Sequence, residues 1–328
     1  MQPVDRKALD LKRRDIDPLM ATAPKHWVRC HVWLEIAKKR CQICNRPIRY
    51  FTLTTADLFD VKVLERAGLL GKTSRGYPGL GFCEMDDKTH EDIIRKLRWC
   101  DWSYKGLFEE MVFTYPRFGT DFNFDVVNLD FPSVPFPKHQ APMKGTWGAI
   151  EKMIDVQWDH GISFDLFLTF RGSKDETDAD AIKEVANLIK YNLNAGRGKS
   201  EFEARIGHSN IDKLLEENYK EFLSTGIPKL LINRALTAGY MLTRFEAYCY
   251  QRQGHDIPYH IVKFVFSFEI PHSTGSVFGQ LPPLVSNYDQ AIPMIFSKET
   301  FDISNHLRNK SSLVGELEHD LVLLRSYI

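Results

Sequence analysis

The sequence has no apolar run near the ~20 residues that a membrane-spanning helix requires, so we expect no membrane span. Its first residues are charged and do not resemble a secretion signal, which favours a cytoplasmic protein. Neither sign of charge is in excess, because 43 Lys and Arg balance 43 Asp and Glu. No global field therefore draws the chain toward nucleic acid or an anionic membrane, and any basic surface has to be local.

Several catalytic signatures are also missing. The sequence contains no Gly-x-Ser-x-Gly, no phosphate-binding P-loop and no His-Glu-x-x-His. Hydrolase, P-loop and zinc-protease functions therefore lack the motifs that would indicate them. What the chain does have is an apolar fraction of 43%, including 12% aromatic residues, over 328 residues. That is enough for a substantial buried core.

Cysteines are few, with six in the whole chain, which favours reduced thiols over a disulfide framework. Cys41 and Cys44 are spaced so that both thiolates can bind one tetrahedral metal ion, and Cys30 lies upstream. His26 or His31 could complete the set. We therefore expect either a structural zinc at Cys30, Cys41 and Cys44 or ordinary reduced cysteines at a turn.

Strand-like segments rich in β-branched and aromatic residues alternate with amphipathic helical patterns. The strand-like segments are 48–54, 77–85, 107–114, 124–130 and 164–170, and the helical patterns are 56–70, 88–99, 147–158 and 178–193. Such alternation predicts an α/β fold with a mostly parallel sheet covered by helices on both faces. Two later runs, 240–251 and 259–270, are joined by a short turn and so predict a closing antiparallel hairpin.

These patterns divide the chain into three parts. Residues 1–47 form a helical, cysteine-containing extension, residues 48–270 the α/β domain, and residues 271–328 a helical tail. The tail carries Leu313 and Leu317 at helical spacing and is expected to dock on the domain or on a protein partner.

Polar residues lie at the ends of two predicted strands. Glu84 ends the second, whereas Asn128 and Asp130 end the fourth and are followed by Phe131. Because ligands of open α/β sheets bind at the carboxyl ends of the strands, these side chains predict a ligand site. Asn and Asp at a strand end also commonly bond only to nearby backbone groups, which is the structural alternative.

The order of elements over residues 48–270 resembles class I S-adenosylmethionine-dependent methyltransferases, whose Rossmann-like sheet includes one antiparallel strand. The resemblance implies S-adenosylmethionine as cofactor. It places Glu84, with Met85 beside it, where the family holds the cofactor ribose. It also places the cofactor loop at Thr54, Thr55 and Asp57 after the first strand.

The same resemblance implies the catalytic residues. Asn128, Asp130 and Phe131 lie where amino-methylating members hold the target amine and stack on its ring. The implied function is methylation of an amino group of a nucleic-acid base, which must be flipped out if it lies in a duplex. Local basic clusters at 12–14, 38–40 and 95–98 are the candidate nucleic-acid contacts, or solvated faces.

Two departures from the family leave other functions open. The first loop contains no glycine, and no proline lies between Asn128 and Phe131. An inactive sensor or scaffold subunit of a multi-protein complex, such as an antiphage defence complex, is the first alternative. A metal-dependent nuclease is the second, with carboxylates around a divalent ion. Its candidate ligands are Glu84, Asp125, Asp130 and Asp165.

Overall fold

The structure is a computed structural model. It describes residues 24–54, 58–71, 79–97, 100, 102–138, 145–252, 259–271 and 284–309. No helix in these segments is long and apolar enough to cross a membrane.

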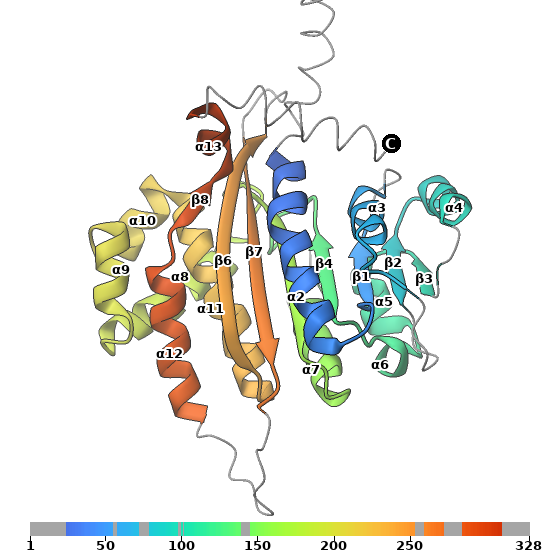
Figure 1. Cartoon of the computed structure of the whole chain (residues 1–328). Helices are drawn as coiled ribbons and strands as arrows, with labels where there is room; N and C mark the ends of the chain where they lie inside the picture. The colour runs from blue at the N-terminus through green and yellow to red at the C-terminus, as the bar shows by residue number, and fades with distance from the viewer. Residues whose placement is uncertain are drawn as a thin grey trace, which may run out of the picture.

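One eight-stranded sheet organises the chain, in the order β3-β2-β1-β4-β5-β7-β6-β8 (Figure 1). The strands are β1 (Tyr50–Leu53), β2 (Leu80–Glu84), β3 (Trp102–Lys105), β4 (Val126–Asp130), β5 (Phe164–Gly172), β6 (Met241–Arg252), β7 (Tyr259–Glu269) and β8 (Thr300–Asp302). Strands β1 to β5 are parallel to one another, and β7 runs antiparallel between β5 and β6. The prediction of a mostly parallel α/β sheet with an antiparallel hairpin is confirmed.

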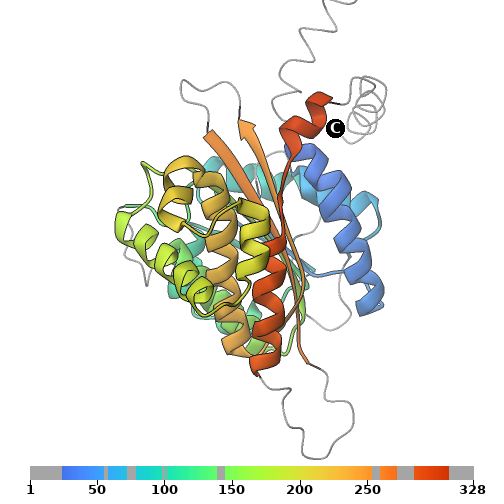
Figure 2. The same ribbon diagram turned by 90° about the vertical axis from the view of Figure 1, so that its left-hand side faces the viewer.

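Helices cover both faces of this sheet. They are η1 (Arg29–Trp33), α2 (Leu34–Cys44), α3 (Phe59–Arg66), α4 (Asp87–Lys96), α5 (Phe108–Thr114), α6 (Phe118–Asp121), α7 (Thr146–Asp159), α8 (Ala179–Asn194), α9 (Lys199–Ile206), α10 (Ile211–Glu217), α11 (Tyr219–Ala238), α12 (Leu284–Ser297) and α13 (Ile303–Asn309). Figure 2 shows α2, in blue, on one side of the sheet and the yellow and orange helices of the chain's second half on the other.

Alternation along the strands produces these two layers, because successive side chains of a strand point to opposite faces. Val127 and Leu129 of β4 pack with α5, α7, α8 and α11 in the larger core cluster. Val126 packs with α3 and the N-terminal helix in the other cluster. A strand that is buried on both sides reads as a continuous apolar run, which is why the sequence predicts β4 and β5 well.

The N-terminal helix belongs to the second layer. Residues 24–44 are helical throughout, with η1 as a π-helical segment immediately before α2. The ring of Trp33 stacks on Phe167 of β5 at a centroid distance of 5.0 Å. This contact packs the helix on the sheet, and Lys25 and Arg29 near its beginning lie beside the carboxyl ends of the strands.

One predicted strand is wrong. Residues 107–114 form the helix α5, and the third strand is the shorter segment Trp102–Lys105 before it. The carboxylate of Glu110 accepts a hydrogen bond from the Leu107 backbone amide at 3.1 Å and so caps the first turn of α5. That capping interaction fixes a helix where apolar content alone suggested a strand.

The C-terminal part contributes more than helix to the fold. Helix α12 contacts α9, α11 and β6, and β8 extends the sheet as a parallel neighbour of β6. The sequence did not predict β8. The helical tail was predicted from the spacing of Leu313 and Leu317, and both residues lie outside the described residues.

Buried ion pairs cross-link the amino-terminal end of the sheet. Nε of Arg40 in α2 lies 2.8 Å from Oδ2 of Asp165 in β5. Asp125, just before β4, receives Nη1 of Arg46 at 2.7 Å and Nη2 of Arg49 at 2.6 Å. These contacts join the end of the N-terminal helix to the central strands.

This network corrects the nuclease hypothesis. Asp125 and Asp165 lie at the beginning of their strands and are bound by arginines, whereas Glu84 and Asp130 lie at the opposite end. The four carboxylates therefore do not surround one ion. In the described segments no group of three or more metal-ligating side chains is found.

A buried lysine in α11 gives a test of stability against pH. Lys229 is 1% exposed, and its Nζ lies 2.5 Å from Oη of Tyr288 in α12. Burial, followed by the charge of Arg197, lowers the pKa of Lys229 to about 7. The unfolded chain keeps a lysine pKa of ~10.4, so between these values the unfolded state binds more protons than the folded state.

We therefore expect the free energy of unfolding to rise between pH 7.5 and pH 9.5, with Lys229 contributing up to about 1.4 kcal/mol per pH unit. Lys229→Met should reduce this slope, measured by urea unfolding at several pH values. Lys183→Met, at an exposed position of α8, is the matched control and should leave the slope unchanged. Equal slopes for Lys229→Met and the unmodified protein would contradict the assignment.

Candidate functional site

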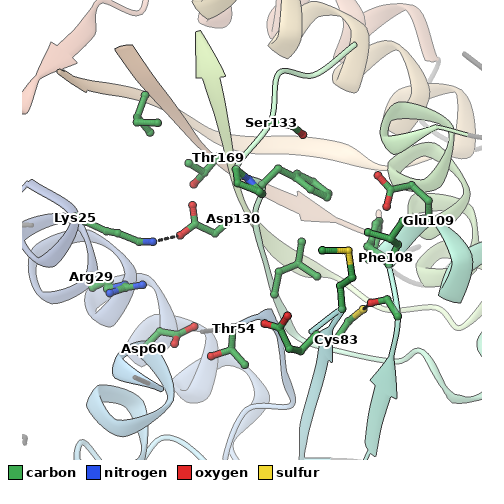
Figure 3. A pocket seen from close by; sticks show the side chains of 18 of the residues that line it. Lys25, Arg29, Thr54, Asp60, Cys83, Phe108, Glu109, Asp130, Ser133 and Thr169 are labelled. Atoms are coloured by element: carbon green, nitrogen blue, oxygen red, sulfur yellow. Dashed lines mark hydrogen bonds and ion pairs between the residues drawn. The ribbon is translucent and has the colours of Figure 1, made fainter. Parts of the chain in front are cut away.

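A cavity of about 730 Å³ opens at the carboxyl ends of β1, β2 and β4 (Figure 3). Its size is that of a pocket for a cofactor or small molecule. It is lined by Lys25, His26, Arg29, Leu53, Thr54, Asp60, Cys83, Glu84, Met85, Gly106, Leu107, Phe108, Glu109, Asp130, Phe131, Pro132, Ser133, Thr169, Tyr250 and Ile261.

Five residues singled out by the sequence line this one cavity. Thr54 comes directly after β1. Glu84 is the last residue of β2 and Met85 follows it, and Asp130 is the last residue of β4 and Phe131 follows it. Parallel neighbours in register bring these three strand ends to the same edge of the sheet. Their roles in binding and catalysis stay predictions. The other two predicted cofactor residues, Thr55 and Asp57, lie outside the described residues.

Glu84 is held at the edge of the cavity by a local hydrogen bond. Its Oε1 accepts from the backbone amide of Asp86 at 2.8 Å, and Asp86 in turn caps α4 by accepting from the amide of Thr89. In the part of the chain that the structure describes, Oε2 of Glu84 has no hydrogen-bond partner. One carboxylate oxygen thus remains available to a ligand hydroxyl.

Asp130 lies among cations. Its Oδ2 is 2.7 Å from Nζ of Lys25, and its Oδ1 is 3.7 Å from Nζ of Lys263 in β7. Burial alone would raise the pKa of Asp130, but the charges of Lys263, Lys25 and Arg29 outweigh it and hold this pKa well below its usual value. The Asp130 carboxylate is therefore ionised at neutral pH.

Lys263 is almost fully buried beneath the cavity, at 1% exposure. Its Nζ donates to Oγ1 of Thr169 at 2.9 Å and lies 5.0 Å from the centroid of the Trp33 ring. Burial lowers the pKa of Lys263 to about 7, although Asp130 acts in the opposite direction. A lysine with this pKa exchanges its proton near neutral pH, which is unusual for the residue type.

Asn128 does not line the cavity. It is 1% exposed, and its Nδ2 donates to Oγ1 of Thr52 and to Oδ2 of Asp60, each at 3.1 Å. Oδ2 of Asp60 also accepts from the hydroxyls of Tyr50 and Thr52, each at 2.7 Å. Asn128 thus lies one layer below Asp130 and holds Asp60, which does line the cavity.

Phe131 presents little free ring surface. It is 6% exposed, its ring stacks on Phe170 at 5.4 Å, and Phe108 meets it edge-on at 5.8 Å. Its contacts are those of a core residue that also forms part of the cavity wall.

The segment between β1 and α3 contains no glycine. Leu58, the residue before α3, has φ 50° and ψ 31°, a left-handed conformation that side chains disfavour. Its own side chain is 2% exposed and packs in the core cluster with α3 and the N-terminal helix, which offsets that cost. Leu58 therefore adopts a backbone conformation that glycine takes without this cost.

The predicted zinc site is not found. Cys30 packs beside Phe59 and Val63, whereas the thiol of Cys41 donates to the backbone carbonyl of Arg46 at 3.2 Å. Burial raises the pKa of the Cys44 thiol, which disfavours the thiolate that zinc requires. Because one helix carries Cys30 and Cys41, their positions are separated by roughly 16 Å along its axis. Among the described residues no metal-binding group replaces this one.

Among the cavity residues that the sequence did not indicate are Lys25, Arg29, Asp60 and Thr169. Lys25 and Arg29 are four residues apart and therefore share one helix face, and Asp60 is the acid in the first turn of α3. Both signals are present in the sequence. Neither indicates a site until the N-terminal helix is known to lie across the strand ends.

No curated protein matches the sequence. Among solved structures, the N-methyltransferase NodS from Bradyrhizobium japonicum WM9 is similar with a TM-score of 0.31 and 10% sequence identity. The match covers 72% of this chain and 95% of NodS. A likeness of this degree bears on neither activity nor substrate.

The sheet itself identifies the fold. Strand order β3-β2-β1-β4-β5-β7-β6 with an antiparallel β7 is the Rossmann-like, methyltransferase-like arrangement that the sequence resembles. A family model described as PP_RS20740-like matches residues 110–276, about half of the chain. The chain belongs to the PP_RS20740-like family.

Proposed function

We propose that this chain is an S-adenosylmethionine-dependent methyltransferase that acts on an amino group. The observation that carries the proposal is the convergence of three strand ends on one cavity, with Glu84 and Asp130 both on its wall. In an open α/β sheet this edge is where ligands bind. The position of each acid agrees with the role that the resemblance gives it.

The residues present fit such a cofactor. Met85 is 62% exposed and Leu107 is 42% exposed, and both lie on the cavity wall, so they offer apolar surface to a flat ring. The free Oε2 of Glu84 would accept a hydrogen bond from a ribose hydroxyl, and Thr54 adds a hydroxyl at the end of β1. When bound, the cofactor would supply an activated methyl group.

Asp130 would hold the target amine. An ionised carboxylate accepts hydrogen bonds from the amine hydrogens, which orients the nitrogen lone pair and stabilises positive charge that develops on the nitrogen. In the structure the ammonium group of Lys25 is bonded to this carboxylate (Figure 3). A substrate amine would take its place.

For the target we propose an amino group of a nucleic-acid base, because the segment Asn128–Phe131 resembles the amino-methylating version of the fold. The local charge available to nucleic acid is less than the sequence suggests. In the basic cluster 38–40, Arg40 is 2% exposed and bound to Asp165 and Glu269. The cluster therefore presents lysines alone.

A second candidate is a methyltransferase-like subunit that binds a ligand or a partner protein without catalysis. Two observations favour it, namely the Lys25 ammonium on Asp130 and the glycine-free loop with Leu58 in a left-handed conformation. Cofactor binding together with methyl transfer would decide for the enzyme, and binding alone for the inactive subunit.

Glu84→Ala is expected to weaken binding of S-adenosylhomocysteine by about 10- to 100-fold, since it removes a hydrogen bond to a charged acceptor worth about 1.5–3 kcal/mol. Isothermal titration calorimetry measures the effect. Glu84→Gln keeps the size and the bond to the Asp86 amide, so its loss should be smaller. Glu91→Ala, an exposed acid on α4, is the control. A flat titration with folded, unmodified protein would refute the cofactor assignment.

A further inference from the structure

Arg29 is a buried cation that pairs directly with no carboxylate among the described residues, although its charge acts on nearby Asp130. It is 8% exposed, lines the large cavity and also borders a cavity of about 10 Å³ beside Trp33 and Asp60. Its Nε is buried without a hydrogen-bond partner. Within the described residues the guanidinium makes no ion pair, and it lies 5.4 Å from the ring centroid of Phe59 and 6.0 Å from that of Trp33.

The neighbouring carboxylates are already occupied by other groups. Asp130 is 2.7 Å from Nζ of Lys25 and is shared with Lys263, whereas Oδ2 of Asp60 accepts three hydrogen bonds. A guanidinium removed from water without an acceptor costs several kcal/mol in general. A cavity-facing cation in this condition is satisfied when a ligand supplies the missing acceptor.

The local helix geometry is also unusual at this residue. Arg29 is the first residue of the π-helical segment η1, and Trp33 is the last. π-Helical turns are rare and occur frequently at functional sites. Arg29, at the start of this segment, lines the cavity, whereas Trp33, at its end, stacks on Phe167 of β5.

Charges are distributed unevenly over the cavity. Lys25 and Arg29 lie on the wall formed by the N-terminal helix, and Figure 3 shows Glu109 on the far side beyond Asp130. Glu84 lines the cavity from the end of β2. A ligand that matches this arrangement carries an anionic group at one end and hydrogen-bond donors at the other.

We propose that Arg29 binds an oxyanion, a carboxylate or a phosphate, of the ligand that enters this cavity, with Lys25 as the second cation. The planar guanidinium matches either group with two parallel hydrogen bonds. Approach of the anion to Lys25 competes with Asp130 for this ammonium and so frees the carboxylate for a substrate amine. The inference rests on the cavity being the site of the proposed function.

The two sources of an oxyanion are distinguished by three ligands in isothermal titration calorimetry. S-adenosylhomocysteine has a carboxylate, 5′-methylthioadenosine lacks it, and adenosine monophosphate carries a phosphate. If Arg29 binds a carboxylate, Arg29→Met should weaken binding of S-adenosylhomocysteine at least 10-fold and change the affinity for methylthioadenosine by less than twofold. If Arg29 binds a phosphate, adenosine monophosphate should bind to the unmodified protein, and Arg29→Met should abolish this binding.

Arg29→Lys separates charge from geometry and should recover part of the affinity. Arg95→Met, at an exposed position of α4, should have no effect. Without ligand, Arg29→Met should melt at the same temperature as the unmodified protein or higher, because it replaces an unpaired buried charge by an apolar side chain. A lower melting temperature would indicate a structural role instead.

The outcomes also separate this inference from the proposed function. If methylthioadenosine and S-adenosylhomocysteine bind equally well and Arg29→Met affects neither, the oxyanion site is refuted while cofactor binding stands. If only adenosine monophosphate binds, and does so through Arg29, the cofactor proposal fails while the oxyanion site stands. Absence of binding by all three ligands to folded protein refutes both.

Discussion

Asp125→Ala is expected to lower the free energy of unfolding by about 3–5 kcal/mol, the usual cost of removing one partner from a buried ion pair. Asp125 is 2% exposed and accepts hydrogen bonds from the side chains of Arg46 and Arg49 and from the backbone amide of Arg49 at 2.8 Å. Without the carboxylate, the buried Arg49 and the partly exposed Arg46 lose their shared anion.

Urea unfolding followed by circular dichroism measures this loss. Asp180→Ala is the matched control, because this aspartate pairs with Lys183 on an exposed face of α8 and should cost less than about 0.5 kcal/mol. Asp125→Asn keeps a hydrogen-bond acceptor, so its loss of unfolding free energy should lie between those of Asp125→Ala and Asp180→Ala. A loss below about 1 kcal/mol for Asp125→Ala would mean that the network contributes little to stability.

The same aspartate predicts a loss of stability in acid. Burial raises its pKa, but the hydrogen bonds from Arg46 and Arg49 outweigh burial and hold the pKa of Asp125 below its usual value. The folded state therefore binds fewer protons than the unfolded state as the pH falls toward and below the unfolded pKa of ~3.9. This contribution to stability is complete at neutral pH and disappears in acid.

Much of the fold follows from the sequence because the central strands are buried on both faces. Segments 124–130 and 164–170 read as apolar runs, and β4 and β5 occupy nearly the same residues. The few residues between β6 and β7 are too short for a parallel crossover, which leaves only an antiparallel pairing. The prediction of the third strand is wrong because β3 has only four residues of alternating exposure at the sheet edge, and such a segment contains no apolar run.

The candidate site follows from the sequence only in part. Parallel strands bring Glu84 and Asp130 to one edge, and a rule of topology is enough to place them there. The cations around Asp130 come from a helix more than a hundred residues upstream and from β7. The sequence does distinguish Lys263, because it is the single charged residue in the otherwise mostly apolar segment 261–268. Its significance depends on which strand is its neighbour.

Asp130→Asn is expected to reduce the rate of methyl transfer by about 10²–10³-fold, the usual cost of removing one group that stabilises developing charge. The amide keeps the size of the carboxylate but lacks its charge, so it orients the amine less well and stabilises positive charge on nitrogen poorly. Binding of S-adenosylhomocysteine should change by less than about threefold, since the role of Asp130 is toward the substrate.

Asn128→Ala separates the two residues that the sequence placed together at this strand end. Because Asn128 is buried and bonded to Thr52 and Asp60, its loss should cost about 1–3 kcal/mol of stability. The methyl-transfer rate of the folded fraction should fall far less than for Asp130→Asn. Rates per folded molecule, with urea unfolding of both variants, make the comparison. Equal rate losses would return Asn128 to the catalytic set, whereas an unchanged rate in Asp130→Asn would remove Asp130 from it.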